Sequence, residues 1–245
     1  MIETIEIRPG DLWVHLAASR ELKTTVLVNR VYYSLLGGGR VAYVGDYQPH
    51  IEARLLALHS LNLRHSYERL AYPFQNTERD RGSLNDLRLD FEELSNLLFI
   101  PTISDAEKLG PFSLIAFDDL TSENQGSNDF IDLRRVTRGQ NVAAIASMTV
   151  PLTSRRRAAE RDGYYQGRNV EPRVYQDADV VTATFLDPEL ERAGRAHWTT
   201  LKYRDGPAPL EIPVQVDFGG TLKVNQVGEK PSKLKVEGAP WWERL

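Results

Sequence analysis

The sequence predicts a single α/β domain with a mostly parallel central sheet flanked by helices and a C-terminal β-hairpin. Strand-sized apolar runs alternate with helix-sized amphipathic segments over most of the chain. From Asp179 onward the pattern changes to successive strands. With 245 residues, 41% of them hydrophobic, the chain is long enough to bury one substantial core. We expect the domain to cover residues 1–227 and a tail to cover 228–245.

The individual elements follow from periodicity and from the residues that end them. The segment from Thr24 to Leu36 has apolar residues at helical spacing and is followed by three glycines, which commonly end helices. A second helix is expected from Pro49 to about Asn62. Strands are predicted at 12–18, 41–45, 114–117, 143–150, 180–186, 197–203, 210–218 and 221–226, helices also at 90–98 and 128–138, and polar loops at 75–90 and 151–173.

Composition excludes several classes of protein. The chain has no cysteine, and its five histidines show no paired metal-ligand spacing, so disulfides and a structural zinc site are not expected. No apolar run approaches the roughly 20 residues of a membrane helix, and the first residues do not resemble a signal peptide. We therefore expect a cytoplasmic protein that does not enter a membrane. A net charge of −4 argues against a surface that is basic all over, but allows a local basic patch.

A phosphate-binding loop is predicted after the first strand. There a polar turn leads into a helix that begins Lys23-Thr24-Thr25. Turn amides and a helix N-terminus can hold phosphate oxygens, while the lysine neutralises charge and the hydroxyl binds magnesium. Two glycines usual in such loops are replaced, by Ala17 and Leu22. Taken alone, the segment could equally be an ordinary exposed turn.

A second nucleotide motif is predicted where the apolar run from Leu114 to Phe117 stops at Asp118 and Asp119. A strand of this kind can deliver a carboxylate to a magnesium ion. Apolar strands that end in acidic residues are frequent, so a turn or a helix cap is the structural alternative. The separation of 95 residues between Lys23 and Asp118 suits a helicase-type core.

Two later segments resemble successive signatures of the DnaB family of replicative helicases. Tyr175 to Val181 contains Gln-Asp-Ala-Asp-Val-Val at a strand entry, and Lys202 to Pro207 follows the pattern Lys-x-Arg-x-Gly-Pro after the next strand. With these anchors the resemblance covers about residues 10–226 and is poorest between about 63 and 110. It implies a RecA-like P-loop NTPase core.

The resemblance implies that ATP and Mg²⁺ are bound at the subunit interfaces of a homo-oligomeric, hexameric ring. Arg204 would then act as the arginine finger of a neighbour's site, together with Lys202; the alternative is a pair of surface charges on a hairpin. The candidate residues are Asp46, Asp118, Lys202 and Arg204 for catalysis, Ser19, Lys23, Thr24 and Thr25 for nucleotide, and Thr24 and Asp118 for the metal.

The same mapping brings the arginine-rich segment 154–173 to the place of the family's DNA-contacting loops. Between residues 151 and 173 six arginines stand against three acids. Arginines could hold the backbone of single-stranded or forked DNA without reading its sequence, although such a run is often only a solvated face. The candidates for nucleic-acid contact are Arg155, Arg156, Arg157, Arg161 and Arg168.

Three departures from the family pattern concern catalysis. The phosphate loop is poor in glycine, Asp46 is the one candidate near the family's water-activating glutamate, and Met148 stands where the family has a glutamine that senses the γ-phosphate. Methionine offers no comparable hydrogen bond. These departures predict hydrolysis that is slow or lost.

Three functions remain open. The leading hypothesis is a helicase-like, DNA-binding ATPase that acts with a partner protein on replication or recombination intermediates. The first alternative is a non-hydrolysing DNA-binding assembly factor, and the second is a metal-dependent nuclease that uses Asp118 and Asp119 with acids between 78 and 90. Because the chain begins close to the motor core, we expect a compact accessory protein, encoded by a phage or plasmid of a bacterial host. Trp241 and Trp242 either dock a partner or fold back onto the domain.

Overall fold

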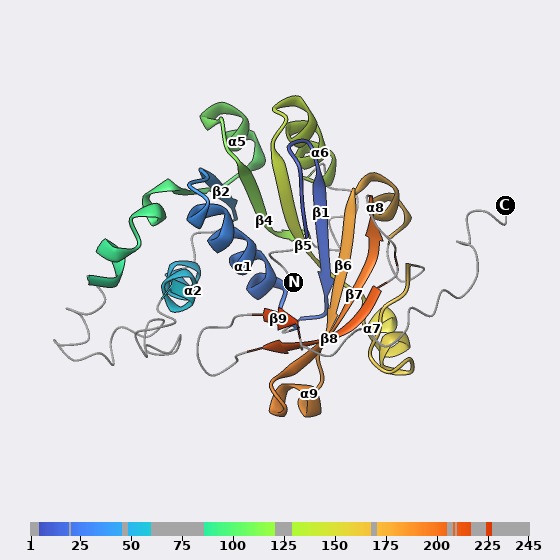
Figure 1. Cartoon of the computed structure of the whole chain (residues 1–245). Helices are drawn as coiled ribbons and strands as arrows, with labels where there is room; N and C mark the ends of the chain where they lie inside the picture. The colour runs from blue at the N-terminus through green and yellow to red at the C-terminus, as the bar shows by residue number, and fades with distance from the viewer. Residues whose placement is uncertain are drawn as a thin grey trace.

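A computed structural model describes residues 5–19, 21–45, 49–59, 86–120, 129–167, 171–204, 208, 210–216 and 224–226. These residues form a nine-stranded sheet with the order β3-β2-β4-β5-β1-β6-β7-β8-β9 (Figure 1). The strands are β1 (Leu12–Ala17), β2 (Val41–Val44), β3 (Leu97–Ile100), β4 (Leu114–Leu120), β5 (Ala143–Thr149), β6 (Val180–Phe185), β7 (Arg195–Tyr203), β8 (Leu210–Val216) and β9 (Val224–Gln226). The helices are α1 (Lys23–Leu36), α2 (Pro49–His59), the 3₁₀ helix η4 (Glu92–Asn96), α5 (Ile103–Leu109), α6 (Asp129–Gly139), α7 (Leu152–Ala159), α8 (Pro172–Asp177) and α9 (Pro188–Arg192).

The sheet has a parallel and an antiparallel part. Strands β3, β2, β4, β5, β1 and β6 run parallel to their neighbours. Strands β7, β8 and β9 then continue the sheet in antiparallel pairs. The predicted α/β class, with a mostly parallel sheet and a C-terminal hairpin, is therefore confirmed.

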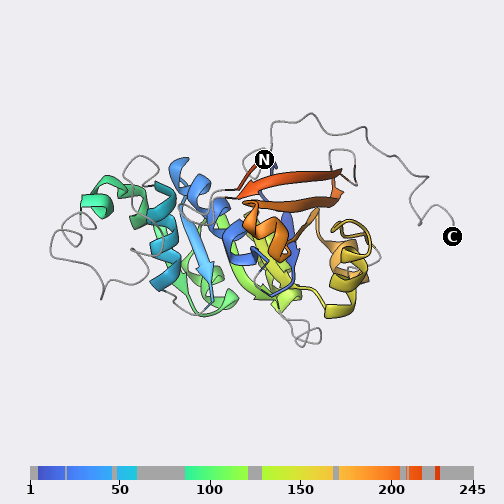
Figure 2. The same cartoon turned by 90° about the horizontal axis from the view of Figure 1, so that it is seen from below.

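Helices cover both faces of the sheet, and alternation along each strand divides the core in two. On β1, Trp13 packs with the face covered by α1 and α2, whereas Val14 and Leu16 pack with α5, α6, α7 and α8 on the other face. Successive side chains of a strand point to opposite faces, so a strand buried on both sides is apolar throughout. All six residues of β1 are buried accordingly. Figure 2 looks along these layers from below.

Parallel strands bring their carboxyl ends to one edge of the sheet, and this edge carries the phosphate-loop segment. Helix α1 begins at Lys23, directly after the turn that leaves β1. It ends at Gly37, and the following Gly38 has a φ of 75°. Glycine adopts this left-handed conformation without steric cost, so the predicted helix end is confirmed.

Two segments differ from the sequence-based expectation. Residues 90–98 were expected to be helical, but η4 ends at Asn96 and β3 begins at Leu97. Residues 151–173 were expected to be a loop, yet they contain all of α7 and the first residues of α8. Helix α7 has no apolar stripe because it buries only Ser154 and Ala158, while its alanines and arginines favour helix through their intrinsic propensity. Of the predicted loop 75–90, residues 86–90 are helical and 75–85 lie outside the described residues.

None of the helices in the described ranges is long and apolar enough to cross a membrane. The tail at 228–245, with Trp241 and Trp242, lies outside these ranges.

Candidate functional site

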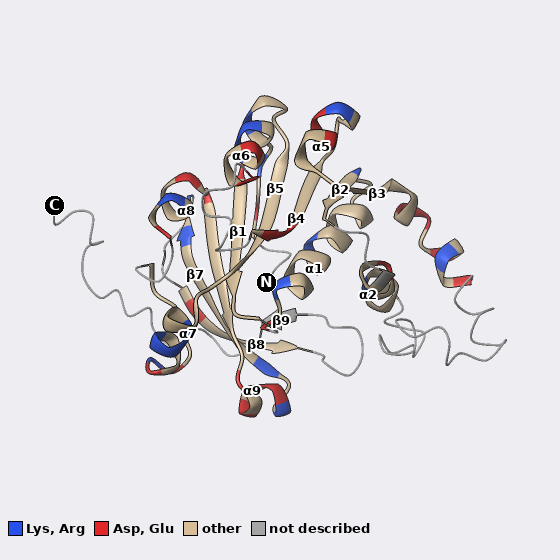
Figure 3. Cartoon of the chain, turned by 180° about the vertical axis from the view of Figure 1, so that it is seen from behind, with Lys and Arg blue, Asp and Glu red and all other residues tan. Residues whose placement is uncertain are grey.

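The carboxyl ends of β1, β4 and β5 form the candidate site together with the start of α1. In open α/β sheets, ligands bind beyond the carboxyl ends of parallel strands. In Figure 3 the acidic end of β4 lies close to the beginning of α1. Asp118 and Asp119 belong to β4, and Lys23 and Thr24 open α1. The two predicted nucleotide motifs therefore meet in space.

Asp118 is oriented by three hydroxyl groups from three different elements. Its Oδ2 accepts hydrogen bonds from Thr24 Oγ1 at 2.8 Å and from the Tyr43 hydroxyl at 2.9 Å. Its Oδ1 accepts one from Ser147 Oγ at 2.5 Å. Burial, and then the nearby Asp118 carboxylate, raise the pKa of Tyr43, so its phenol stays protonated and remains a donor. Asp118 is thereby fixed beside the Thr24 hydroxyl.

Asp119, the next residue, has a different partner. The Lys23 ammonium donates to the Asp119 carboxylate and to the Thr149 hydroxyl. Thr149 Oγ1 in turn donates to Asp119 Oδ2 at 2.9 Å. The side chains of Lys23 and Asp119 are 16% and 22% exposed, so this ion pair is only partly screened by solvent. A phosphate that binds Lys23 must therefore compete with Asp119.

Leu22 adopts the backbone conformation that a glycine would favour at this place. It has φ 70° and ψ 11°, in the left-handed region that bulky residues rarely enter. Its side chain is 8% exposed and packs in the core cluster that includes Trp13 and Val26. Burial of a leucine side chain stabilises by about 1.5–3 kcal/mol, which offsets a strain of similar size.

Glu21 holds the loop from below. Its carboxylate accepts hydrogen bonds from the Ala18 amide at 3.3 Å, from the Tyr165 hydroxyl at 3.3 Å and from Arg155 Nε. The Glu21 side chain is 4% exposed. Burial raises the pKa of this carboxyl, and the hydrogen bond and charge of Arg155 act in the opposite direction. The loop is thus tied to helix α7, which carries Arg155.

A chain of hydrogen bonds through the sheet holds the backbone of the same loop. Thr184 Oγ1 donates to the Glu21 carbonyl at 2.7 Å, so it accepts from His15 Nε2 at 3.1 Å. His15 therefore carries its proton on Nε2, and Nδ1 accepts from Thr182 Oγ1 at 2.9 Å. Thr182 in turn accepts from Trp13 Nε1 at 2.7 Å. Burial and the charge of Lys23 lower the pKa of His15 to about 3, so the ring is neutral.

The other residues predicted to bind nucleotide are not part of this cluster. Thr25 is buried, and its Oγ1 accepts a hydrogen bond from Arg54 Nη1 of α2 at 2.9 Å. Ser19 is exposed in the loop after β1. Asp46 lies outside the described residues. The preceding Gly45 contacts the site closely, because a Cβ there would be 2.8 Å from the Asp118 carbonyl oxygen.

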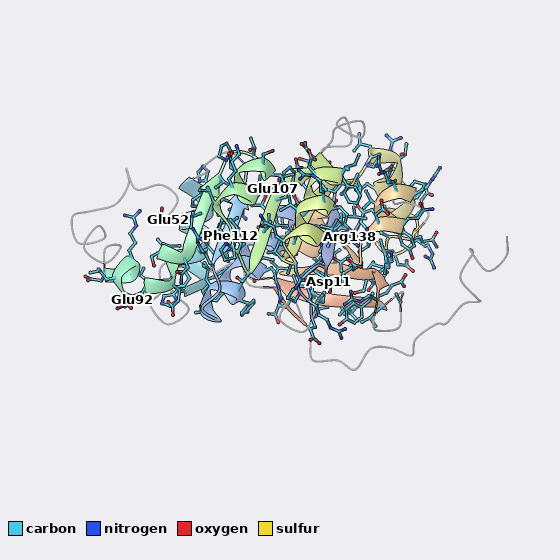
Figure 4. All side chains as sticks on the ribbon, turned by 90° about the horizontal axis from the view of Figure 1, so that it is seen from above. Asp11, Glu52, Glu92, Glu107, Phe112 and Arg138 are labelled. Carbon is cyan, nitrogen blue, oxygen red and sulfur yellow. The ribbon has the colours of Figure 1, made fainter. Side chains whose placement is uncertain are left out.

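Lys202 and Arg204 lie at the opposite edge of the sheet, where the parallel strands begin. Lys202 Nζ donates to the carbonyl oxygens of Tyr175 and Gln176 at 2.9 and 3.0 Å. Arg204 makes two hydrogen bonds to Asp11, one of them from Nη2 at 3.0 Å. Figure 4, seen from above, labels Asp11 at this edge together with Phe112 and Arg138.

The two sequence signatures that resemble the DnaB family therefore contact each other at this edge. Asp179, from the first signature, accepts a hydrogen bond from the Leu12 amide at 2.9 Å and pairs with Arg134 at 2.7 Å. Its Oδ1 is 3.9 Å from Arg204 Nη1, from the second signature.

The arginines of the 154–173 segment differ in their surroundings. Arg155 points inward, where Nη2 donates to the Leu186 carbonyl at 3.1 Å and the guanidinium lies 5.4 Å from the Phe185 ring centre. Arg156 and Arg157 are exposed on α7. Arg161 is exposed and lies 3.9 Å from Glu211. Arg168 is outside the part of the chain that the structure describes.

Several site residues carried no recognisable signal in the sequence. Tyr43, Glu21 and His15 are such residues. Ser147 and Thr149 could have been found, because they flank Met148 and alternation turns them to the face opposite to it. Met148 itself is 6% exposed and packs in the cluster with α5 to α8. Across the described residues, no three histidine, aspartate or glutamate side chains form a group that could hold a metal, so nothing there supports the nuclease alternative.

Comparison with known proteins identifies the fold. No family model matches the chain, and no curated protein matches it in sequence. Among solved structures, the ATPase domain of one DnaB-like helicase matches with a TM-score of 0.70 and 14% identity, covering 90% of this chain and 86% of that one. A DnaB-like replicative helicase, described with its interactions with primase, matches with a TM-score of 0.65 and 14% identity over 86% of this chain; the chain spans 56% of that helicase. The RadB recombinase matches with a TM-score of 0.56 and 17% identity over 90% of this chain and 92% of that one. Together with the strand order, these likenesses show that the chain has the fold of a RecA-type P-loop ATPase core.

Proposed function

We propose that this protein is a helicase-like, DNA-binding ATPase that binds ATP and Mg²⁺ between the subunits of a ring. The observation that carries the proposal is the meeting of Lys23, Thr24 and Asp118 at the carboxyl ends of β1 and β4. A hydroxyl and a carboxylate 2.8 Å apart are oxygen donors of the kind that Mg²⁺ prefers. A lysine at the start of a helix is a suitable partner for phosphate oxygens.

Each residue has a defined role in this proposal. The Lys23 ammonium would exchange Asp119 for the outer phosphates. Thr24 Oγ1 and Asp118 would hold the metal, with Asp118 kept in orientation by Tyr43 and Ser147. When bound, the metal would neutralise charge that develops on the phosphate oxygens.

Arg204 supports an assembly in which a neighbouring subunit completes the site. Asp11, its partner, precedes β1, whereas the phosphate loop follows β1. Six residues of strand separate the two ends by about 20 Å, so Arg204 cannot reach the loop of its own subunit. It could reach the loop of a neighbour in a ring, which we propose to be a hexamer. Lys202 would act there with Arg204.

The exposed arginines of α7 support contact with DNA. Arg156 and Arg157 lie on a helix that begins directly after β5, at the same edge of the sheet as Lys23. With Arg161 and Arg168 they would hold the phosphates of single-stranded or forked DNA, as expected at replication or recombination intermediates. We leave Arg155 out of this set because its guanidinium is engaged with Glu21 and Leu186.

A second candidate function is a non-hydrolysing DNA-binding assembly factor on the same fold. The observation that favours it is the ion pair of Lys23 with Asp119, since this pair occupies the ammonium that would otherwise bind phosphates. A strained leucine in the phosphate loop also favours it.

ATP hydrolysis with and without single-stranded DNA tests both candidates. We expect turnover that DNA stimulates and that Lys23→Ala and Arg204→Lys each abolish, with Arg135→Gln on α6 as a charge control outside the site. Lysine at position 204 keeps a cation beside Asp11 but loses the guanidinium fork. Binding of nucleotide and DNA without turnover would support the assembly factor, and DNA cleavage with magnesium alone would contradict both candidates.

A further inference from the structure

The Glu21 carboxylate and Arg155 join the phosphate loop to helix α7. Arg155 Nε donates to Glu21 Oε1, and Glu21 Oε2 accepts from Tyr165 and from the Ala18 amide, each at 3.3 Å. The Glu21 side chain is 4% exposed and that of Arg155 is 33% exposed. Both groups are therefore fixed, one inside the protein and the other at its margin.

This connection is mechanically short. Glu21 is two residues before Lys23, and Leu22 between them is buried in the core. On the other side, Arg155 is directly followed by the exposed Arg156 and Arg157 in the same helical turn. One ion pair thus separates the lysine of the phosphate loop from the exposed cations of α7.

Breaking the pair is strongly unfavourable, so its two ends move together. Loss of Arg155 would leave a buried carboxylate whose remaining donors are neutral, and a buried charge without its counter-charge is destabilising. Arg155 is itself fixed by the Leu186 carbonyl at 3.1 Å and by the Phe185 ring. A shift of α7 therefore requires a shift of Glu21, and of the backbone that carries Lys23.

We propose that Arg155 is a positioning residue, which through Glu21 couples nucleic-acid contact at Arg156 and Arg157 to the shape of the phosphate loop and hence to nucleotide affinity. This inference rests on the proposed function, because it needs both ligands to bind. Coupling of this kind is reciprocal: DNA changes nucleotide affinity by the same factor by which nucleotide changes DNA affinity.

The test compares nucleotide affinity with and without a saturating single-stranded oligonucleotide, by fluorescence anisotropy of a labelled ATP analogue. We expect the oligonucleotide to change the affinity of the unmodified protein by about fivefold or more, as is usual for coupled sites. In Arg155→Gln and in the isosteric Glu21→Gln, each ligand alone should bind within about threefold of the unmodified protein, as expected when an effect is confined to coupling. The ratio between the two nucleotide affinities should fall to about one in both variants.

Arg135→Gln is the matched control, since it removes an exposed arginine charge of α6 at the other edge of the sheet and should keep the ratio. Melting temperatures of all variants show whether each one folds, and Glu21→Gln remains informative if Arg155→Gln does not. If the protein binds both ligands but shows no coupling, or if both variants keep the full ratio, the role of Arg155 is wrong. If the unmodified protein binds no nucleotide or no DNA, the proposed function itself is wrong.

Discussion

Asp118 and Asp119 are neighbours in sequence, but their surroundings give them different tasks. Asp118 accepts hydrogen bonds from three hydroxyls, which orient a carboxylate without neutralising it. Asp119 pairs with the Lys23 ammonium and so occupies the cation of the phosphate loop. Asp118 is therefore suited to hold a metal, and Asp119 to regulate access to Lys23.

Replacement of Asp119 by asparagine should tighten nucleotide binding. The amide keeps the size of the side chain but no longer holds Lys23 by charge, so the ammonium is released for phosphate. We expect an affinity higher by about three- to tenfold, since a partly exposed ion pair contributes on the order of 1 kcal/mol. Titration with a labelled ATP analogue measures this. Asp118→Asn is the comparison: it should weaken binding in magnesium and leave binding in EDTA unchanged. Weaker binding by Asp119→Asn would contradict the competition between Asp119 and phosphate.

The neutral state of His15 makes stability depend on pH. Its pKa is about 3 in the folded protein, against an ordinary value of 6.5. Between these values the unfolded chain binds a proton that the folded protein does not, so stability is full above about pH 6.5 and falls as the pH is lowered. Relative to His15→Gln, whose amide does not titrate, the free energy of unfolding should fall by about 2 kcal/mol more between pH 7 and pH 5. Urea denaturation at a series of pH values measures both proteins; the same pH dependence in both would show that His15 is protonated in the fold.

At the scale of single elements, α7 is the part of the proposed DNA interface that the structure describes best. Its residues Arg156 and Arg157 are exposed, so their charges are available to nucleic acid. Each phosphate contact with single-stranded DNA contributes about 0.7 to the slope of log affinity against log salt. Arg156→Gln with Arg157→Gln should therefore lower that slope by about 1.4. The control is Arg135→Gln with Arg138→Gln on α6, which removes the same charge at the opposite edge (Figure 4). An equal loss in both double variants would mean that only net charge matters.

The elements differ in how far the sequence predicts them. The parallel strands beside β1 were predicted because both faces of each are buried, which makes the whole run apolar. Helix α7 was missed because it lies on the surface and buries only two side chains, so it has no apolar stripe to detect. Strand β3 was missed because four residues are too few to distinguish a strand from part of a helix.

The candidate site was predicted only where it follows a local pattern. Lys23 and Asp118 were found because each stands at the end of a strand, in a recognisable order. Tyr43 and the Glu21–Arg155 pair were not found, since these contacts join residues 75 and 134 positions apart. Such contacts are created by the fold and leave no spacing in the sequence.

At the scale of the whole molecule, the two groups of functional candidates lie at opposite edges of one sheet. Lys23 follows β1, and Arg204 is bonded to Asp11 before β1. An ATP site that needs both residues cannot form within one subunit. It can form at every interface of a ring in which the phosphate-loop edge of one subunit faces the Arg204 edge of the next, a head-to-tail arrangement that closes by rotation.

This arrangement predicts that two inactive variants restore each other when mixed. In a one-to-one mixture of Lys23→Ala and Arg204→Lys subunits, an interface is intact when the subunit that gives the loop carries Arg204→Lys and its neighbour carries Lys23→Ala. Random assembly makes about a quarter of the interfaces intact, so about a quarter of the DNA-stimulated turnover should return if the sites act independently. Each variant alone should stay inactive while it assembles like the unmodified protein, which size-exclusion chromatography with light scattering checks. A mixture that forms joint rings and yet stays inactive would place Arg204 outside the catalytic site, and its bond to Asp11 would then be structural.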